Sequence, residues 1–205
     1  MFIDYQNVYK RAREAFRHVN DHWHVHGQVR PVAAGLTLRG DKDSGRELVA
    51  VHAYRGLPST RHDPRGYDAA QRQMASWVAT GGGIVVPHHR PLNYRDPANP
   101  REKGIDVMLA IDFVRLAIQE QYDVGVIFSD DTDLHPALEA VGEILGPDHA
   151  ELATWADPTR SGPRVVQSGG TKVKTQVLDA VAYGRIRDTQ DYNVRTARKP
   201  RPPRR

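Results

Sequence analysis

Short, continuous apolar runs alternate along this chain with longer segments whose apolar residues recur at helical spacing. The apolar runs are residues 2–3, 48–54, 84–86, 124–128 and 152–155. The segments with helical spacing are residues 8–19, 67–80, 105–118, 134–145 and 175–183. Strands that are apolar throughout, and that alternate with helices, are typical of a parallel sheet covered on both faces. The sequence therefore predicts an α/β fold with a central, mostly parallel sheet.

One part of the chain does not follow this alternation clearly, and two of the strands have expected ends. Residues 20–46 are rich in His, Gly and charge, and we expect a long connection or a loose hairpin between Val29 and Leu38. Pro87 is expected to end the strand at 84–86. The run at 152–155 is expected to be the last strand, followed by a loop over residues 157–171.

Acidic residues stand where the apolar runs end. Asp4 follows the first run directly, and Asp130, Asp131 and Asp133 follow the fourth. Asp106 lies in the first turn of the helix that comes after the third run. Ligands of parallel α/β sheets bind at the carboxyl ends of the strands. Three distant segments are therefore expected to deliver carboxylates to one edge of the sheet.

Carboxylates gathered at one edge repel one another and are costly to remove from water. Their convergence favours a divalent cation between them, and carboxylate oxygens are ligands that Mg²⁺ and Mn²⁺ prefer. We expect Asp4, Asp106 and Asp131 to bind the metal, directly or through water. Asp133 is expected to be a further ligand or to orient a water. Such a cation stabilises charge on a phosphoryl oxygen, so the pattern indicates an enzyme acting on a phosphate-containing substrate.

Each acid taken alone has a plainer interpretation. Asp131 and Asp133 are residue types favoured at the N-terminus of the helix that follows them. Asp106 is favoured in a first turn by the helix dipole, and Asp4 suits a turn. The metal hypothesis depends on all three segments ending at the same edge.

Polar residues beside the acids are candidates for substrate binding. The Asn7 amide is placed to hold a carboxylate or a phosphate, and Lys103 to offset the acidic charge and contact a backbone phosphate. Ser129 is a candidate either to cap the following turn or to hydrogen-bond a ligand carboxylate. We expect the side chain of Asp130 to point away from the metal, and Asp112 to have a structural role.

Three motifs together resemble the pattern of the NYN domain, a branch of the PIN-like ribonuclease superfamily. That pattern has D-x-x-N after its first strand, K-G-h-D-h at a helix start, and S-G-D-x-D-[FL] after a later strand. The matching stretches are Asp4-Tyr5-Gln6-Asn7, Lys103-Gly104-Ile105-Asp106-Val107 and Ser129-Asp130-Asp131-Thr132-Asp133-Leu134. Asp130 stands where the pattern has Gly, which adds a charge and a Cβ at a tight turn. The match in order and spacing covers roughly residues 1–157.

The resemblance implies a Rossmann-like PIN fold, a Mg²⁺ or Mn²⁺ centre and endoribonuclease activity on RNA. It implies that Asp4, Asp106, Asp131 and Asp133 carry the metal and the catalysis, with Asn7 nearby. A homo-oligomer or a protein partner is left open.

The charge of the chain is unevenly distributed. The net charge is +4, yet residues 195–205 hold six cations and no acid, which leaves about −2 on the rest. A Pro-rich basic stretch of this kind is typical of disorder, and either attracts RNA phosphates non-specifically or is merely a solvated terminus. We expect an NYN-like nuclease domain over residues 1–185, with 20–46 as an insertion or long connection. A basic disordered tail is expected over residues 186–205.

Composition restricts the class of protein. Hydrophobic residues make up 39% and charged residues 26%, which is ordinary for a globular protein. Cys is absent, which excludes disulfides, thiolate metal sites and Cys catalysis and suits a reducing cytoplasm. No apolar run is long enough to span a bilayer, and the N-terminus lacks a signal-peptide pattern, so we expect no membrane association.

Other signals are weaker. His22, His24 and His26 would share one face of a strand, but no further ligand completes a zinc site. The pair His88-His89 follows the third run and is interpreted as loop, with RNA contact or acid catalysis as the alternative. Gly81-Gly82-Gly83 lacks the Lys and Ser or Thr of a phosphate-binding loop and is read as a helix stop.

Two hypotheses compete with the ribonuclease. An aspartyl-phosphate phosphatase would need a second acid two residues after Asp4, where this chain has Gln6. An RNA-binding or scaffold protein with a non-catalytic metal site would share the acidic motifs but would not cleave RNA.

Overall fold

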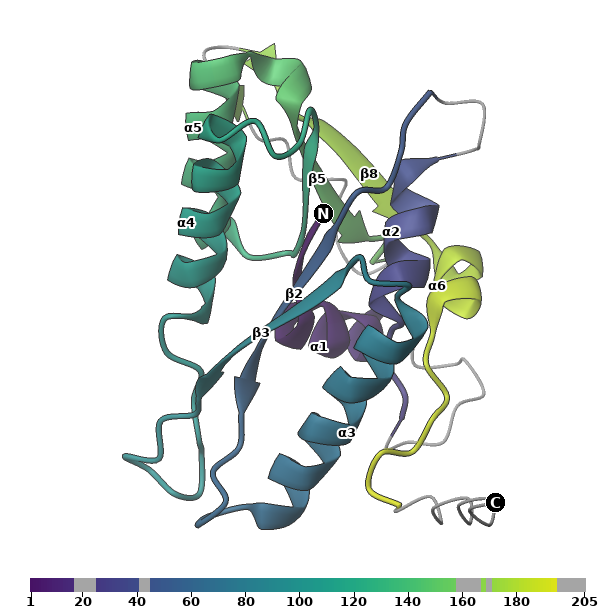
Figure 1. The fold of residues 1–205 in the computed structure, drawn as a ribbon, viewed down its shortest axis with the longest axis vertical. Helices are drawn as coiled ribbons and strands as arrows, with labels where there is room; N and C mark the ends of the chain where they lie inside the picture. The colour runs from purple at the N-terminus through teal and green to yellow at the C-terminus, as the bar shows by residue number, and fades with distance from the viewer. Residues whose placement is uncertain (17–24, 41–44, 158–166, 169–170, 195–205) are drawn as a thin grey trace, which may run out of the picture.

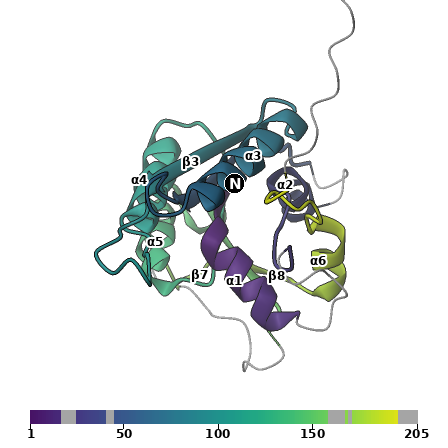
Figure 2. The same ribbon diagram turned by 90° about the horizontal axis from the view of Figure 1, so that it is seen from below.

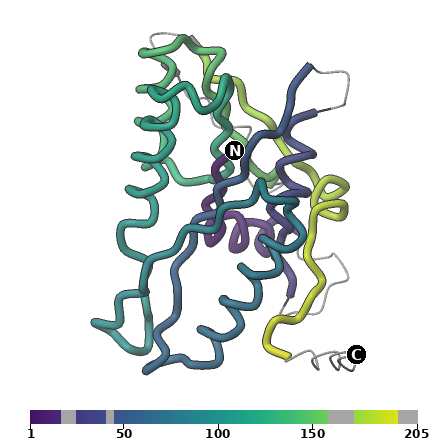
Figure 3. The backbone as a smooth tube through the Cα atoms, in the orientation of Figure 1, coloured from purple at the N-terminus to yellow at the C-terminus, as the bar shows by residue number. Residues whose placement is uncertain are grey.

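A single parallel sheet forms the centre of the computed structural model, which describes residues 1–16, 25–40, 45–157, 167–168 and 171–194. Its strands are β1 (Phe2–Asp4), β2 (Val51–Leu57), β3 (Val85–Pro91), β4 (Gly125–Phe128), β5 (Ala150–Trp155) and β8 (Lys174–Leu178). Their order is β3-β2-β1-β4-β5-β8, so the N-terminal strand lies in the middle of the sheet, as the backbone trace in Figure 3 shows. Two short strands, β6 (Gln167–Ser168) and β7 (Thr171–Lys172), pair separately and antiparallel. The predicted parallel α/β sheet is confirmed.

Helices cover both faces of the sheet (Figure 1). One face carries α1 (Tyr5–Ala15), α2 (Pro31–Arg39), α3 (Pro64–Thr80) and α6 (Ala180–Ile186). The other carries α4 (Ile105–Ile118) and α5 (His135–Leu145). Short 3-10 turns η2 (Thr132–Leu134) and η3 (Pro147–His149) flank α5. Seen from below in Figure 2, α4 and α5 lie on one side and α2 and α6 on the other.

Alternation along the central strands divides the core in two. Phe2 and Ile127 pack with the α4 and α5 side, whereas the next residues, Ile3 and Phe128, pack with the α1 and α3 side. Successive side chains of a strand point to opposite faces, so strands that are apolar at every position suit a sheet buried on both faces. Asp4, the residue after Ile3, therefore emerges on the α4 side at the carboxyl edge.

The expected hairpin between Val29 and Leu38 is wrong, because residues 31–39 form α2. Pro31 stands at the start of the helix, where its missing N–H costs nothing. The buried positions Pro31, Ala34, Gly35 and Leu38 follow one helical stripe, a period that the Gly and charge of the surrounding residues obscured. Residues 17–24 and 41–44 of this connection lie outside the described part of the chain.

The strand at 84–86 was expected to stop at Pro87, but β3 continues to Pro91. β3 is an edge strand that pairs only with β2, with Pro87 opposite Ala53. Proline is tolerated on an edge because no outer neighbour needs its N–H. This extension carries His88, His89 and Arg90 into the sheet instead of a loop.

The expected helix over 175–183 and the expected position of the last strand are also wrong. Residues 174–178 form β8, which pairs in parallel with β5, and only residues 180–186 are helical. Asp179 divides the two elements, because its carboxylate accepts the Ala182 N–H at 2.8 Å and caps α6. Pairing with β5, rather than local periodicity, selects the strand.

The described chain remains packed beyond residue 185. Ile186, Asp188 and Tyr192 are buried. The Arg72 side chain donates to the Tyr192 carbonyl at 2.8 Å, and the Tyr192 hydroxyl donates to Asp188 at 2.7 Å. The folded part thus extends past the boundary expected from the sequence, while the basic stretch 195–205 lies outside the described residues. No helix in the described ranges is long and apolar enough to cross a membrane.

Trp77 on α3 tests the packing of the α1 and α3 side. Its side chain is 2% exposed and lies 4.5 Å from the Tyr5 ring, centroid to centroid. We expect Trp77→Ala to lower the free energy of unfolding by about 3–5 kcal/mol, through lost burial and a cavity. The neighbouring Val78, 47% exposed, is the control, and Val78→Ala should change it by less than about 0.5 kcal/mol. Urea denaturation of both variants measures this, and equal effects would contradict the layer assignment.

Candidate metal centre

Asp4 is a buried carboxylate at the end of the central strand β1. It is 2% exposed and lies beside Tyr54 of β2 in the sheet register. One carboxylate oxygen accepts the Asn7 N–H at 3.2 Å, which makes Asp4 the N-cap of α1. The other oxygen accepts the Ser129 hydroxyl at 2.9 Å. Local capping and the contact from Ser129, directly after β4, together fix the direction of this side chain.

The turn after β4 places Asp131 next to Asp4. Ser129 is buried, and its hydroxyl oxygen also accepts the Asp131 N–H at 3.1 Å. One Asp131 oxygen accepts the Asp133 N–H at 3.0 Å, so Asp131 caps the turn η2, as its plainer interpretation predicted. Capping by one oxygen leaves the second available to a ligand. Ser129 therefore connects the two acids directly.

Asp106 reaches the same edge from the first turn of α4. The preceding Gly104 has φ +76°, a left-handed conformation that favours glycine, and it allows the sharp entry into the helix. One ligand oxygen from each of Asp4, Asp106 and Asp131 lies within 4.8 Å of the others. We call these three residues the acidic triad. The structure thus brings together the three distant segments that the sequence singled out.

Asp133 stands apart from the acidic triad. It is exposed in η2, just before α5, and does not belong to the group of mutually close oxygens. Its charge nevertheless acts on Asp106, whose pKa is raised first by burial and then by the negative charges of Asp131 and Asp133.

The electrostatics of the acidic triad suit a divalent cation. Burial raises the pKa of Asp4 to about 7, against the lowering effect of the Asn7 and Ser129 hydrogen bonds. These two partners are neutral, so they orient the carboxylate without balancing its charge. The carboxylates of the triad repel one another when ionised, which disfavours their charged form without a cation. Carboxylate oxygens gathered in this way are the ligands that Mg²⁺ or Mn²⁺ prefers.

The candidate substrate-binding residues occupy different positions. Asn7 accepts the Asp130 N–H at 2.9 Å through its side-chain oxygen, so it ties α1 to the turn after β4. Ser129 is buried and orients Asp4 and Asp131. Lys103 is exposed just before α4. Of the three, Lys103 is the one whose side chain lies open to a ligand.

Asp130, which stands where the family pattern has Gly, points away from the acidic triad as expected. Its carboxylate accepts the Thr154 hydroxyl and lies 3.7 Å from the Arg11 side chain. Among the described residues other than glycine, Glu120 is the one with a positive φ, so the φ of Asp130 is not positive. The turn therefore accommodates a side chain without backbone strain. Thr154 of β5 and Arg11 of α1 interact with the added carboxylate.

Sequence reasoning missed Glu102. Its side chain is partly buried and accepts the Gly56 N–H from the end of β2. Burial and then the nearby Asp106 raise its pKa, and its own charge contributes to the raised pKa of Asp4. The sequence feature that could have indicated Glu102 is its position immediately before the Lys103-Gly104 pair, in a stretch that otherwise has the pattern of a loop.

Asp112 and His88 form a separate polar cluster on the same face. Asp112 accepts the Tyr54 hydroxyl at 3.0 Å and an Arg115 N–H at 2.8 Å. Although burial acts to raise the pKa of Asp112, these bonds hold it below its usual value. The His88 ring stacks on Tyr54 at 4.4 Å, and burial lowers its pKa. This supports the structural role expected for Asp112 and places His88 in a strand, not a loop.

The remaining signals from the sequence are resolved in part. His26 is buried, whereas His22 and His24 lie outside the described residues. Helix α3 ends at Thr80, directly before the three glycines that were read as a helix stop.

Comparison with known proteins identifies one family. The family model described as NYN domain matches residues 1–144, which span β1 to most of α5 and include all members of the acidic triad. Searches of curated proteins and of solved structures returned no match.

The raised pKa of Asp4 predicts how stability depends on pH without added metal. Asp4 keeps its proton up to about pH 7 when folded, but loses it near its ordinary value of 3.8 when unfolded. Its contribution to stability is therefore present at low pH and is lost as pH rises through this window. Asp4→Asn removes the titration and retains a capping side chain. The Tm of the variant minus that of wild type should grow by at least about 3 °C across the window.

Scanning calorimetry in EDTA at several pH values measures this difference. His52 and His88, whose pKa values burial lowers, act in the opposite direction in both proteins and cancel in the comparison. A difference that stays constant with pH would contradict the buried, protonated state of Asp4.

Proposed function

The chain belongs to the NYN domain family, and we propose that it is a metal-dependent endoribonuclease that hydrolyses RNA phosphodiester bonds. The family is a PIN-like nuclease domain, which supports a nuclease kind of function. The observation that carries the proposal for this chain is the acidic triad, whose oxygens meet within 4.8 Å at the carboxyl edge of the sheet. That edge is where parallel α/β folds bind their ligands.

In this proposal the acidic triad holds Mg²⁺ or Mn²⁺. Such a cation supplies charge stabilisation at a phosphoryl oxygen and a water of lowered pKa. Ser129 orients Asp4 and Asp131 through its hydroxyl, and Asn7 fixes the turn that carries Asp131. We further propose that Asp133 orients a water and that Lys103 contacts a phosphate of the substrate, and the side chains of both are exposed.

RNA is the proposed substrate. The family supports a nuclease, and the cations of residues 195–205 would add non-specific attraction for phosphates. The absence of Cys suits the reducing cytoplasm that we propose as its compartment. Nothing in the acidic triad selects a particular RNA sequence, since its carboxylates would act on the backbone and not on the bases.

Replacing one acid of the triad tests the enzyme directly. With Mg²⁺ or Mn²⁺, wild type should cleave a labelled RNA internally, and Asp131→Asn should lower the cleavage rate by about 100-fold or more. Asn is nearly isosteric and also caps η2, so the fold should persist. EDTA should abolish cleavage by wild type. Gel analysis of an end-labelled RNA measures the rate.

Asp148→Asn is the matched control. Asp148 is an exposed acid in η3, directly before the amino end of β5, whereas the triad lies at the carboxyl edge of the sheet. It should cleave RNA at the wild-type rate. Equal cleavage by wild type and Asp131→Asn would reject the enzyme and indicate a contaminating nuclease. Tight RNA binding without cleavage by wild type would instead favour an RNA-binding or scaffold protein with a non-catalytic metal site.

A further inference from the structure

A pocket of about 230 Å³ lies between α1 and α3, on the face of the sheet away from α4 and α5. None of the acidic triad lines it. Among the described residues of its lining, Arg55 of β2 is the one charged group, and we call it the Arg55 pocket. Its volume is below the roughly 300–1,000 Å³ of pockets that hold drug-sized molecules, so it suits a small ligand.

The Arg55 side chain is held in a fixed orientation. Its guanidinium carbon lies 5.7 Å from the centre of the Tyr5 ring and 5.9 Å from that of Trp77. Its Nε donates to the Gly56 carbonyl at 3.3 Å, and its Nη1 donates to the side-chain oxygen of Gln73. The amide nitrogen of Gln73 in turn donates to the Tyr5 hydroxyl at 2.8 Å. Gln73 and the two rings therefore orient the cation before any ligand binds.

The charge of Arg55 has no carboxylate partner. In the part of the chain that the structure describes, Arg55 forms no ion pair. Burial lowers the pKa of its guanidinium, whereas Tyr5 and Glu102 act against this shift. The Glu102 carboxylate is engaged elsewhere, because it accepts the Gly56 N–H. A buried cation without an ion-pair partner is costly, and an anion that enters the pocket would offset this cost.

Arg55 also has unused hydrogen-bonding capacity. A guanidinium has five N–H groups, and Gly56 and Gln73 accept two of those of Arg55. The others, including both on Nη2, have no partner within the described residues. Two parallel N–H groups at the edge of a guanidinium match two oxygens of an oxyanion. The pocket therefore presents an oriented donor pair to a ligand.

The surroundings of the pocket favour a ligand with a single negative charge. Arg55 supplies one positive charge, and the starts of the flanking helices already carry carboxylates, because Asp4 caps α1 and Asp63 caps α3. A phosphate monoester carries about −1.5 to −2 at neutral pH and would be repelled. A phosphodiester of RNA has one charge, but the nucleosides on its two sides exceed a pocket of this size. A carboxylate has one charge and two oxygens for the guanidinium.

We propose that the Arg55 pocket binds a small organic carboxylate. The carboxylate accepts two N–H groups of the Arg55 guanidinium. Ala69 and Ala70 of α3 provide apolar surface for a short carbon chain, and the Gln6 amide hydrogen-bonds a polar substituent of the ligand. The site is separate from the acidic triad, and the inference does not depend on the proposed function.

Nuclear magnetic resonance of the full chain, without added metal, tests the site with glycolate, a hydroxycarboxylate of one negative charge. At fixed ionic strength and neutral pH, glycolate should shift the Arg55 Nε–H signal and the Ala70 backbone amide signal in a saturable way. The expected Kd is about 10 mM or lower. Glycolamide, its neutral analogue, and inorganic phosphate should each bind at least about tenfold more weakly.

Filling the pocket tests its role without changing the charge. Ala69→Leu places a larger side chain in the lining, keeps a good helix former and should abolish the glycolate shifts at Arg55. Ala75→Leu is the matched control, because Ala75 is exposed on the same helix outside the lining. It should bind glycolate as wild type does.

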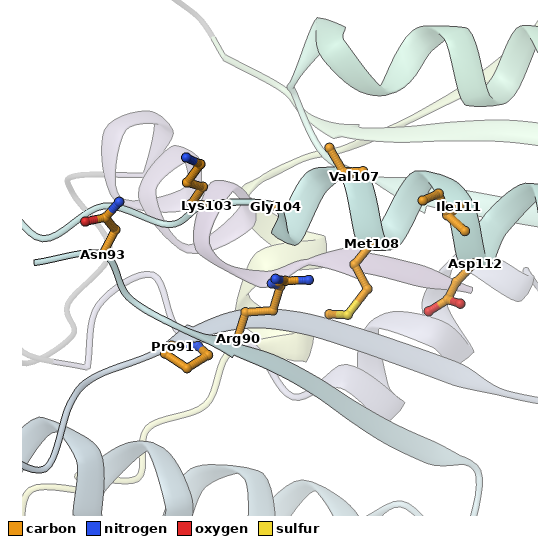
Figure 4. A pocket seen from close by; sticks show the side chains of 9 residues that line it. All are labelled: Arg90, Pro91, Asn93, Lys103, Gly104, Val107, Met108, Ile111 and Asp112. Carbon is orange, nitrogen blue, oxygen red and sulfur yellow. The ribbon is translucent and has the colours of Figure 1, made fainter.

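The donor pair is tested by a substitution that keeps the positive charge. Arg55→Lys removes the parallel N–H groups and should raise the Kd for glycolate by about fivefold or more, measured at the Ala70 amide. Arg90→Lys is its control. Arg90 is an exposed arginine that lines a separate groove of about 530 Å³ between β3 and α4, shown in Figure 4. This control should leave the Kd unchanged.

The possible results decide the inference without reference to RNA. A saturable shift that Ala69→Leu abolishes and Arg55→Lys weakens supports the carboxylate site. Equal shifts in wild type and Ala69→Leu, or no saturable shift up to about 100 mM glycolate, would overturn it and leave Arg55 as a structural cation. Tighter binding of phosphate than of glycolate would overturn the assignment of a singly charged ligand. The acidic triad is tested separately, by the cleavage assay with Asp131→Asn.

Discussion

The structure depends on a carboxylate that is buried in the middle of the sheet. Asp4 ends the central strand, and its neighbours β2 and β4 remove it from water on both sides. Burial of an acid is costly, and the hydrogen bonds from Asn7 and Ser129 offset only part of that cost. In the proposed function, a divalent cation would supply the missing positive charge. The same geometry that weakens the metal-free protein therefore prepares a site for hard cations.

The acidic triad is held by short polar connections between segments far apart in the sequence. Ser129 joins Asp4 to the turn bearing Asp131, and Asn7 joins the start of α1 to the same turn. The Asp130 carboxylate points the other way, where it accepts the Thr154 hydroxyl and lies near the Arg11 side chain. Because Ser129 and Asn7 are neutral, they orient the acids without balancing the negative charge that these acids carry when ionised. Rigid placement of such groups is what a reaction at a phosphate requires.

Some features could be predicted from residues close in the sequence, and others could not. Asp4 and Asp106 were found because each stands beside a local signal, the end of an apolar run or a helix start. Glu102 lies in a stretch that reads as loop, and only its contact with Gly56 of β2 reveals its place. The helix expected at 175–183 was wrong because pairing with β5 outweighed the periodicity of these residues.

The sequence by itself determined the type of fold and which acids stand at the carboxyl ends of the strands, because apolar runs, caps and turns are set by neighbouring residues. The tertiary structure decided that Asp133 lies outside the acidic triad, that β8 is a strand, and that β3 and α4 enclose a groove. These outcomes depend on distances between segments separated by tens of residues. Packing fixes such distances, and no local pattern contains them.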